Sequence, residues 1–412
     1  MKKIVSMICL GFSSGLPYML IFSTLSIWLR DSGIELVAIG FFAWISLTYS
    51  LKFLWSPLID KYSIPILSIF GKRKSWIILM QLLIIAQLLL ISFLNPSNQL
   101  YVIAIIATLI ALAGSFQDIA IDAFRIELSE LRNQGNLAAG YQFGYRAAIL
   151  VATSLALILA DEYSWNVSYQ LMAILMTIGI IGSLIVPEGL SNKLVLNSGI
   201  VNNLAEPIKD FFQRTSLFIA CLLLLIIATY RLTDIVMGPM ANPFYLDMGF
   251  SLTEIGSVVK IVALFASIIG LFFGGILIKK IGIMHSLIVG AFAVMISNLL
   301  FALVAVSDKN LVMLSMIVFS DSFSAGMVGT VNIAFLTSLV SKKYTATQYA
   351  LLTSFMMLPG KLLSGFSGVI ASFFQDLTNT FMGWMWFFVF TSLLTLPAIV
   401  LIIFFKKNIR LD

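Results

Sequence analysis

The sequence predicts an all-α membrane protein with twelve transmembrane helices in two six-helix halves. Of its 412 residues, 60% are hydrophobic and only 11% are charged, whereas soluble domains carry about 25% charged residues. Uncharged apolar runs such as 77–94 and 382–405 recur along the whole chain. Each run has roughly the 18–20 residues needed to cross the hydrocarbon core of a bilayer. Composition and patterning therefore both place the chain in the membrane.

Short polar loops separate the apolar runs and divide them into twelve predicted spans. The longest polar segment, 187–215, follows the sixth span. We interpret it as a cytoplasmic linker, with a short surface helix at 205–212, between an N-terminal half (1–186) and a C-terminal half (216–412). The predicted spans are 4–29, 36–55, 76–94, 100–124, 137–159, 166–186, 216–239, 253–277, 284–305, 311–339, 347–374 and 382–405.

Basic residues are distributed unevenly between the two sides of the predicted membrane. Most of the 25 lysines and arginines lie in the loops and termini of one side, and the opposite side holds Arg30 and Lys309. Because basic loops stay in the cytoplasm, we expect both termini inside. The net charge of +6 is thus a topology signal and does not indicate a nucleic-acid partner.

The cysteine content argues against a metal centre. Cys9 and Cys221 both lie in apolar spans, and their spacing fits neither a zinc site nor a disulfide framework. We expect no metal and no cofactor, and a monomer surrounded by lipid.

A short repeat relates the two halves. The sequence "DSGIELVAIG" at 31–40 returns as "DMGFSLTEIG" at 247–256, about half the chain later. Each copy leads from the first into the second span of its half. Two parallel halves of six spans are the organisation of major facilitator transporters, whose substrate sites lie near the midplane.

The end of the second span carries a candidate gate. The span runs into "SPLIDKY" and then "GKRK", where Asp60 and Arg73 could form a cytoplasmic latch. A positively charged topology anchor explains the same residues, and both interpretations stay open. Arg125, after the fourth span, and Lys361, after a Pro-Gly break in the eleventh, complete the predicted gate.

Two aspartates interrupt the apolar fourth span in "FQDIAIDAFR". Asp118 is expected at the depth of Arg146 in the fifth span, and Asp122 nearer to Arg125, Lys52 or the basic loop. Intramembrane acids either pair with bases and fix helix packing or serve function. Under the functional hypothesis Asp118 or Asp122 exchanges a proton during transport.

A second charged group lies in the seventh span. Arg231 and Asp234 follow Tyr230 and share one helical face. They are either an internal pair or a base presented to an anionic substrate. A further acid, Asp321, lies among small residues in the tenth span.

Aromatic and amide side chains inside spans could stack on or hydrogen-bond a sugar-like ligand. Tryptophans at span ends fit interface anchors instead. The predicted anchors are Trp28, Trp55, Trp76, Trp165, Trp384 and Trp386. The predicted substrate-binding residues are Tyr18, Trp44, Gln117, Tyr141, Gln142, Tyr145, Arg146, Tyr230, Arg231, Asp234, Asn332 and Gln348.

Several motifs resemble one family when taken in order. "GFSSGLPY", "QDIAIDAFR", "GYR", "YRLTD" and "YTATQYALLTS" resemble AmpG-type muropeptide permeases of the major facilitator superfamily. The resemblance implies import of N-acetylglucosaminyl-anhydro-N-acetylmuramyl peptides across the bacterial inner membrane, coupled to protons, by alternating access. One departure is Arg231, where the family often has lysine.

Other functions remain as alternatives at this point. Bases in spans (Arg146, Arg231, Lys260 and Lys361) would also suit acyl-coenzyme A or another anionic solute. A membrane sensor that transports nothing would share the same composition. A membrane enzyme is not expected, because the sequence shows no nucleophile or metal constellation in a substantial loop.

Overall fold

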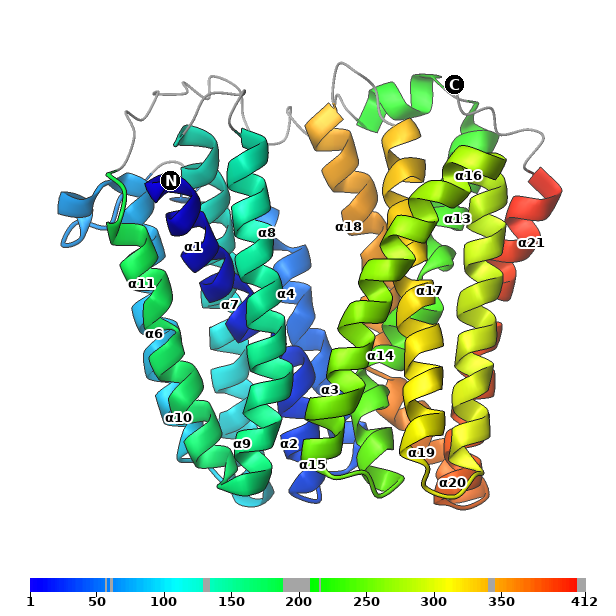
Figure 1. Ribbon diagram of the computed structural model, residues 1–412. Helices are drawn as coiled ribbons and strands as arrows, with labels where there is room; N and C mark the ends of the chain where they lie inside the picture. Colours follow the sequence, from blue (N-terminus) through cyan, green and yellow to red (C-terminus); the bar gives the residue numbers. More distant parts are fainter. Residues whose placement is uncertain are drawn as a thin grey trace. The chain divides into compact units, whose positions relative to one another are not determined.

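A computed structural model describes residues 1–55, 58–59, 62–128, 134–187, 208–214, 216–339 and 345–405. Within these ranges every regular element is helical, and there is no strand (Figure 1). Helices satisfy their backbone hydrogen bonds within one segment, which lipid requires because it offers no partners. The predicted all-helical class is confirmed.

The chain forms two compact units. Unit 1 joins Met1–Lys193 to Ser251–Lys260, and unit 2 joins Leu194–Phe250 to Ile261–Asp412. Unit 1 contains α1 (Lys2–Met19), η1 (Leu20–Thr24), α2 (Leu25–Asp31), α3 (Leu36–Phe42), η2 (Ala43–Ser46), α4 (Leu47–Ser50), η3 (Lys52–Leu54), η4 (Ser68–Phe70), α6 (Lys72–Ser92), α7 (Pro96–Glu127), α8 (Gln134–Leu150), η6 (Val151–Leu155), α9 (Ala156–Glu162), α10 (Trp165–Leu175), α11 (Thr177–Leu184), α15 (Leu252–Glu254) and η7 (Ile255–Val259).

The helices of unit 2 include one that starts at the boundary with unit 1. They are a short helix at 208–214, α13 (Leu217–Tyr230), α14 (Leu232–Asp247), α16 (Lys260–Ala305), α17 (Leu311–Ser338), α18 (Thr345–Ser364), α19 (Ser367–Leu377), α20 (Thr380–Leu393) and α21 (Leu396–Phe405).

The described helices account for the twelve predicted spans. Ten segments are long and apolar enough to cross a membrane, and a shorter apolar one covers Leu36–Ser50. One of the ten, Leu252–Ala305, has 54 residues, which at ~1.5 Å per residue is more than twice the hydrocarbon thickness. It turns at Gly282, whose φ of 77° breaks the helix between the eighth and ninth predicted spans.

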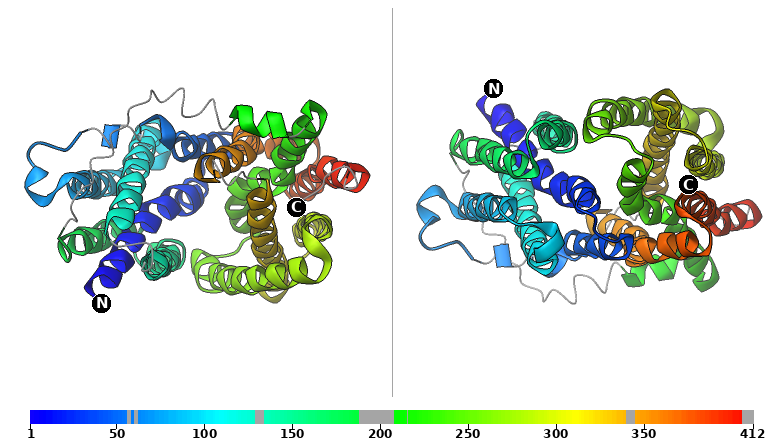
Figure 2. Two further views of the ribbon diagram at one scale, coloured as in Figure 1. Left: turned by 90° about the horizontal axis from the view of Figure 1, so that it is seen from above. Right: turned by 90° about the horizontal axis from the view of Figure 1, so that it is seen from below.

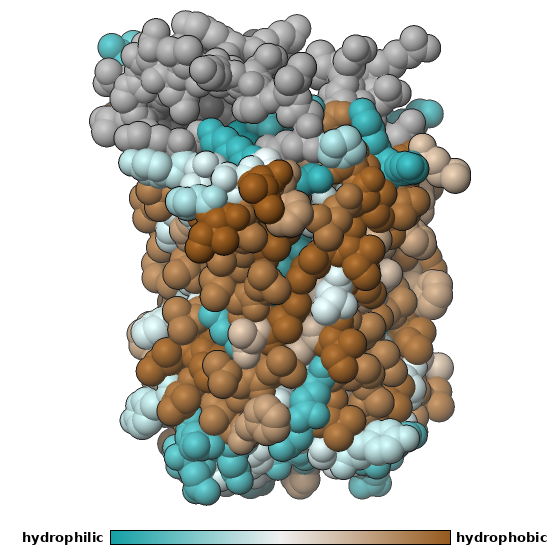
Figure 3. Space-filling view, turned by 90° about the vertical axis from the view of Figure 1, so that its left-hand side faces the viewer, coloured by the Kyte–Doolittle hydropathy of each residue, from teal (hydrophilic) through white to brown (hydrophobic). Residues whose placement is uncertain are grey.

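Apolar side chains cover the surface as lipid contact requires. In Figure 3 one face of the molecule shows a broad apolar band above a hydrophilic lower border. Large side chains such as Tyr101, Ile105 and Ile174 are more than half exposed. In a protein surrounded by water such exposure would be costly, so the band marks the membrane-embedded surface.

Helix α1 is the centre of unit 1. It packs against α7, α8 and α11, and both views in Figure 2 show it among these helices. Its contact with α8 is very close: a Cβ on Gly11 would overlap the Tyr141 carbonyl, and one on Gly144 would overlap the Ile8 carbonyl. Small residues allow such backbone approach between membrane helices. The glycines of "GFSSG" and "GYQFG" therefore fix the position of α1 against α8.

One end of unit 1 is held by a group that we call the first clasp: Trp28, Asp31, Trp165 and Tyr169. The Trp165 indole N–H donates to the Asp31 carboxylate at 2.7 Å. The Trp28 ring stacks on Trp165 with centroids 5.7 Å apart and contacts Tyr169 at 4.8 Å.

The second clasp repeats this arrangement in unit 2 with Phe244, Asp247, Trp384 and Phe388. Trp384 donates to Asp247 at 2.9 Å. The Phe244 ring contacts Trp384 at 5.5 Å and Phe388 at 4.8 Å. Asp31 and Asp247 are the first residues of the sequence repeat, so the repeat reflects one recurring structural device.

The clasps correct one prediction about tryptophans. Trp28, Trp165 and Trp384 are 3%, 9% and 0% exposed, so they are packing residues and not interface anchors. A tryptophan near a span end is ambiguous in sequence, because its N–H can be satisfied by an aspartate of another helix as well as by the lipid headgroup region.

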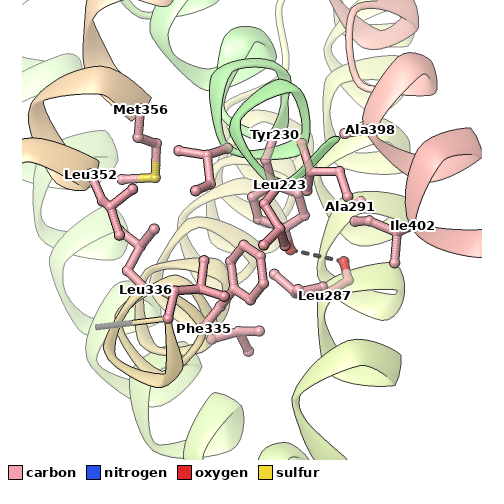
Figure 4. Close-up of a cluster of buried hydrophobic side chains, with 14 of the residues drawn as sticks. Leu223, Tyr230, Leu287, Ala291, Phe335, Leu336, Leu352, Met356, Ala398 and Ile402 are labelled. Carbon is pink, nitrogen blue, oxygen red and sulfur yellow. Dashed lines mark hydrogen bonds between the residues drawn. The ribbon is translucent and has the colours of Figure 1, made fainter. Parts of the chain in front are cut away.

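The core of unit 2 surrounds Tyr230. Its ring lies among Leu223, Leu287 and Phe335, and its hydroxyl donates to the Leu287 carbonyl at 2.8 Å (Figure 4). Buried tyrosine hydroxyls need such a partner. Tyr230 is therefore a core residue of the helices α13, α16 and α17.

The helix at 208–214 overlaps the surface helix predicted at 205–212. Asp210 pairs with Arg214 at 2.9 Å and accepts a hydrogen bond from Gln348 at 2.9 Å. Arg214 also donates to Gln348 at 3.0 Å and to the Leu339 carbonyl at 3.3 Å. This polar network ties the helix to the end of α17 and the start of α18.

Candidate functional site

A chain of three hydroxyl and carboxyl groups lies inside unit 1. Ser14 of α1 donates a hydrogen bond to Asp118 of α7, and its oxygen lies 2.7 Å from the Tyr141 hydroxyl of α8. Three helices thus each contribute one group. Because α1 and α8 approach closely at the glycines, the short Ser14 side chain reaches both Asp118 and Tyr141.

The electrostatic environment of Asp118 includes groups from each neighbouring helix. Lys52 attracts the Asp118 carboxylate, whereas Asp122 on the same helix repels it. Tyr49 and Tyr145 also interact with its charge. Asp118 is therefore balanced by hydroxyls and one lysine without a direct ion pair among the described residues.

Aromatic rings lie beside this chain. Tyr18 packs edge-on against Tyr49 with centroids 5.0 Å apart, and Tyr141 lies 6.3 Å from Tyr145. The Tyr49 hydroxyl is buried without a hydrogen-bond partner in the described structure, close to Gly114. Of the predicted binding residues, Tyr18, Tyr141 and Tyr145 therefore gather around Asp118.

Gln117 is fully buried next to the chain. Its amide N–H donates to the Ser13 carbonyl at 2.9 Å, and within the described residues its Oε1 has no partner. Asn332 of α17 is also buried, at 4% exposed, and its Nδ2 finds no partner there. Gln117 and Asn332 are thus buried amides that are only partly satisfied among the described residues, which costs about 1–3 kcal/mol per group.

The predicted proximity of Asp118 and Arg146 is not observed. Arg146 is exposed and, in the described part of the chain, makes no ion pair with Asp118. Position along a span predicts depth alone, whereas contact also requires two side chains to face each other. Of the partners considered for Asp122, the structure gives Arg125, at 3.3 Å.

Two predicted binding residues lie apart from the Asp118 group. Trp44 is exposed beside Phe41, with ring centroids 5.1 Å apart, and lines an apolar groove with Leu100 and Tyr101. Gln142 is exposed on α8. Neither is among the side chains that the structure places around Asp118.

Arg73, a predicted gate residue, is buried at the start of α6. It donates to Glu127 of α7 at 2.8 Å and to the Ile59 carbonyl at 3.1 Å. Breaking such a buried pair leaves a charge without its partner, at a cost of about 3–5 kcal/mol. Asp60, its predicted companion, lies outside the described residues, and Glu127 is the acid that the structure provides.

Unit 2 contains its own charged group. Arg231 interrupts the helix between α13 and α14 and lies 3.4 Å from Asp234. Asp321 of α17 accepts a hydrogen bond from Ser297 of α16 at 3.1 Å and interacts electrostatically with Asp234. The internal pair considered for Arg231 and Asp234 is therefore present.

The remaining predicted residues of unit 2 are hydrogen-bonded to other parts of the chain or buried. Gln348 is 2% exposed and bonded to the helix at 208–214, and Tyr230 belongs to the core. Lys361 is 8% exposed on α18, one residue after Gly360, which packs tightly against Ile235.

Three residues of these contacts were not predicted from the sequence: Ser14, Glu127 and Ser297. A serine inside a span is common, and nothing in its local sequence shows whether it bonds its own helix or a carboxylate. The signal for Ser14 is the flanking pair of glycines in "GFSSG", which indicates a close helix neighbour. No group of metal-ligating side chains occurs in the described residues.

The comparisons with known proteins agree with this architecture. The sequence profile of the Major Facilitator Superfamily matches residues 7–362. The protein named AmpG 4 of Rickettsia felis is 33% identical over 414 residues, 99% of this chain and 97% of that protein. The anhydromuropeptide permease of Escherichia coli K12 is 33% identical over 406 residues, 98% of this chain and 80% of that protein.

The chain belongs to the AmpG family of the Major Facilitator Superfamily. The resemblance found in its motifs is confirmed. It is a multi-pass membrane transporter and not an enzyme.

Solved structures show the same fold. The nucleoside transporter NupG matches with a TM-score of 0.75 and 13% identity, over 97% of this chain and 99% of that one. The peptide transporter POT in complex with sulfate matches with a TM-score of 0.72 and 12% identity, over 99% of this chain and 94% of that one. At such low identity these structures support the fold alone.

Proposed function

We propose that this transporter imports muropeptides, disaccharides of N-acetylglucosamine and anhydro-N-acetylmuramic acid with or without peptide, and couples their uptake to protons. The import runs by alternating access across the bacterial inner membrane, with both termini in the cytoplasm. The two six-helix halves, 1–186 and 216–412, would be its moving parts.

The Ser14–Asp118–Tyr141 chain is the observation that carries the proposal. A carboxylate within a span is costly to bury and is therefore a candidate functional group. Here the hydrogen-bond partner of the carboxylate is a hydroxyl. Such a group can gain and lose a proton without breaking an ion pair. The tyrosines around it offer stacking faces and hydroxyls, which suit a sugar. The name of the Escherichia coli relative, anhydromuropeptide permease, favours this class of sugar.

Uptake by purified protein in proteoliposomes tests the proposal. We expect radiolabelled N-acetylglucosaminyl-anhydro-N-acetylmuramic acid to accumulate when the outside is acidic, and accumulation to stop when a protonophore is added. Uptake that is unchanged by the protonophore would contradict proton coupling. The absence of any muropeptide uptake or binding would contradict the substrate assignment.

A second candidate cargo is an anionic solute such as an acyl-coenzyme A. The exposed Arg146 guanidinium and the Arg231 Nε, which is buried without a partner among the described residues, favour it. Competition in the same assay separates the two. A coenzyme A ester that blocks muropeptide uptake at low concentration would favour the anionic cargo. A protein that binds a ligand without moving it would support a sensor.

A further inference from the structure

The hydrogen-bond chain in unit 1 has a direction that follows from the number of protons available. An ionised carboxylate can only accept, so Ser14 must donate its single hydroxyl proton to Asp118. Ser14 then has no proton for its second bond, to Tyr141 at 2.7 Å. Tyr141 must therefore donate to Ser14, and its own hydroxyl proton is fully used.

A proton on Asp118 removes this constraint. The carboxylic acid has one O–H donor, which can point to the Ser14 oxygen. Ser14 then donates to Tyr141, and the Tyr141 hydroxyl proton becomes available to another acceptor. In this step Asp118 gains one proton from the surrounding water. The Ser14 and Tyr141 hydroxyls keep their own protons and only rotate their O–H bonds.

We propose that Ser14 is a positioning residue that reports the protonation of Asp118 to Tyr141 by reversing this chain, so that Tyr141 becomes a donor to the substrate only when Asp118 carries a proton. This inference rests on the proposed function, because it supplies the link between the proton and the sugar. Muropeptide oxygens are acceptors, so the protonated protein should bind them more tightly.

The packing around the chain favours a defined path for this reversal. The overlap that a Cβ at Gly11, Gly15 or Gly144 would cause shows that the α1 and α8 backbones are in contact, which holds Ser14 and Tyr141 at a fixed separation. Tyr141 as a residue is only partly buried.

The other charged and titratable groups near the Ser14–Asp118–Tyr141 chain come from five helical segments. They are Tyr18 of α1, Tyr49 of α4, Lys52 of η3, Asp122 of α7 and Tyr145 of α8. Only Lys52 and Asp122 among them carry a charge near neutral pH. Lys52 attracts the Asp118 carboxylate and Asp122 repels it, and both residues are unchanged in every variant described next.

The decisive experiment measures muropeptide affinity against pH for the purified full-length protein. In the unchanged protein we expect affinity to fall about fivefold to tenfold between acidic and alkaline pH, the value of one hydrogen bond. Ser14→Ala, in which Tyr141 no longer donates to Ser14, should bind at the tight limit at every pH, and Tyr141→Phe should bind at the weak limit at every pH. Ser14→Thr, which keeps the hydroxyl, should retain the pH dependence.

Asp118→Asn and Ser13→Ala complete the set. The side-chain amide that Asp118→Asn introduces can donate to Ser14, so the affinity of this variant should stay near the tight limit at every pH. Ser13 lies next to Ser14, and its hydroxyl bonds the Leu10 carbonyl and the Gln81 amide. Its variant should titrate like the unchanged protein. A Ser14→Ala protein that keeps the full pH dependence would overturn the proposal.

A second measurement decides the proposal even if muropeptides do not bind. Infrared difference spectra of protein with ring-labelled tyrosine report whether a tyrosine hydroxyl donates or accepts. Acidification should shift a tyrosine band in the unchanged protein and in Ser14→Thr, but not in Ser14→Ala or Tyr141→Phe. A band shift that persists in Ser14→Ala would overturn the proposed reversal of the hydrogen bonds. Missing muropeptide binding alone would refute only the proposed substrate.

Discussion

Asp31 in unit 1 and Asp247 in unit 2 each accept a hydrogen bond from a tryptophan, at 2.7 and 2.9 Å. The glycines that follow them, Gly33 and Gly249, both have a φ of 79°, a backbone region that glycine adopts at no steric cost. The two halves therefore keep the same helix ends and the same turn. At these positions the structure repeats with the sequence.

The acids inside the two halves are stabilised in two ways. Asp118 in unit 1 is bonded to a serine hydroxyl, whereas Asp234 in unit 2 lies 3.4 Å from the Arg231 guanidinium. A charged partner holds a carboxylate ionised, and a hydroxyl does so less strongly. Each unit also contains an acid of the other kind: in unit 2 Asp321 accepts a hydrogen bond from Ser297, and in unit 1 Asp122 pairs with Arg125 at 3.3 Å.

The halves also place their closest helix contact differently. In unit 1 the backbones of α1 and α8 touch at Gly11 and Gly144. In unit 2 it is α16 and α17 that touch, at Gly270 and Gly326. The first of these contacts brings the Ser14–Asp118–Tyr141 chain together.

Neutralising Asp118 should have the largest effect on transport. We expect Asp118→Asn to lower proton-driven accumulation of muropeptide at least about 100-fold, with normal protein levels and thermal stability, because the amide keeps the hydrogen bond to Ser14 but binds no proton. Accumulation in proteoliposomes and a melting curve measure both. Coupled accumulation at the normal level would remove Asp118 from the mechanism.

Neutralising Asp234 should instead lower stability. Asp234→Asn leaves Arg231 without its acid, at a cost of about 1–3 kcal/mol, because the pair is only partly exposed. Adding Arg231→Gln should recover most of the loss, since the uncompensated charge is removed. Thermal unfolding of the single and double variants in one detergent is the measurement. A double variant less stable than Asp234→Asn would contradict this explanation.

Replacing a glycine by alanine should lower stability at the α1–α8 contact but not at an open position elsewhere. Gly144→Ala forces a methyl group into the Ile8 carbonyl and should cost about 1–3 kcal/mol. Gly238→Ala, in α14, meets nothing within contact distance and should be neutral or stabilising by up to about 1 kcal/mol. Equal melting temperatures for the two variants would show that α1 and α8 can separate without cost.

The two clasps should respond equally to the same substitution. Trp165→Phe and Trp384→Phe each remove one indole N–H and leave an aspartate without that donor, at a cost of about 1 kcal/mol. Urea unfolding of both variants checks the size and the equality of the losses. A large loss of stability in only one of the two variants would show that the clasps share a geometry but contribute unequally to stability.

Much of the fold could be predicted because hydrophobic runs and loops are local features. Residues close together in the sequence predict the spans and the surface helix before Leu217. The relation of Asp31 to Asp247 follows from comparing two short stretches of ten residues. The break between the eighth and ninth spans was predicted between residues 277 and 284, and Gly282 is where the chain turns.

The candidate site could be predicted only in part. Asp118, Tyr141 and Tyr145 were singled out and lie together, but Arg146 points away from Asp118, and Gln348 bonds the helix at 208–214. Spacing along a span gives depth, whereas partners depend on the rotation of each helix about its axis. That rotation is set by packing against neighbours far away in the sequence.

The sequence by itself determined that this chain crosses the membrane as two related six-helix halves, because burial in lipid demands apolar runs of a fixed length. It also determined which few spans carry charge. Only the tertiary structure decided that a serine connects Asp118 to Tyr141 and that Arg231 pairs with Asp234. The serine contact joins helices distant in sequence and depends on glycines that let two backbones touch. Arg231 and Asp234 are only three residues apart, but the sequence left open whether they pair with each other or Arg231 is presented to a substrate.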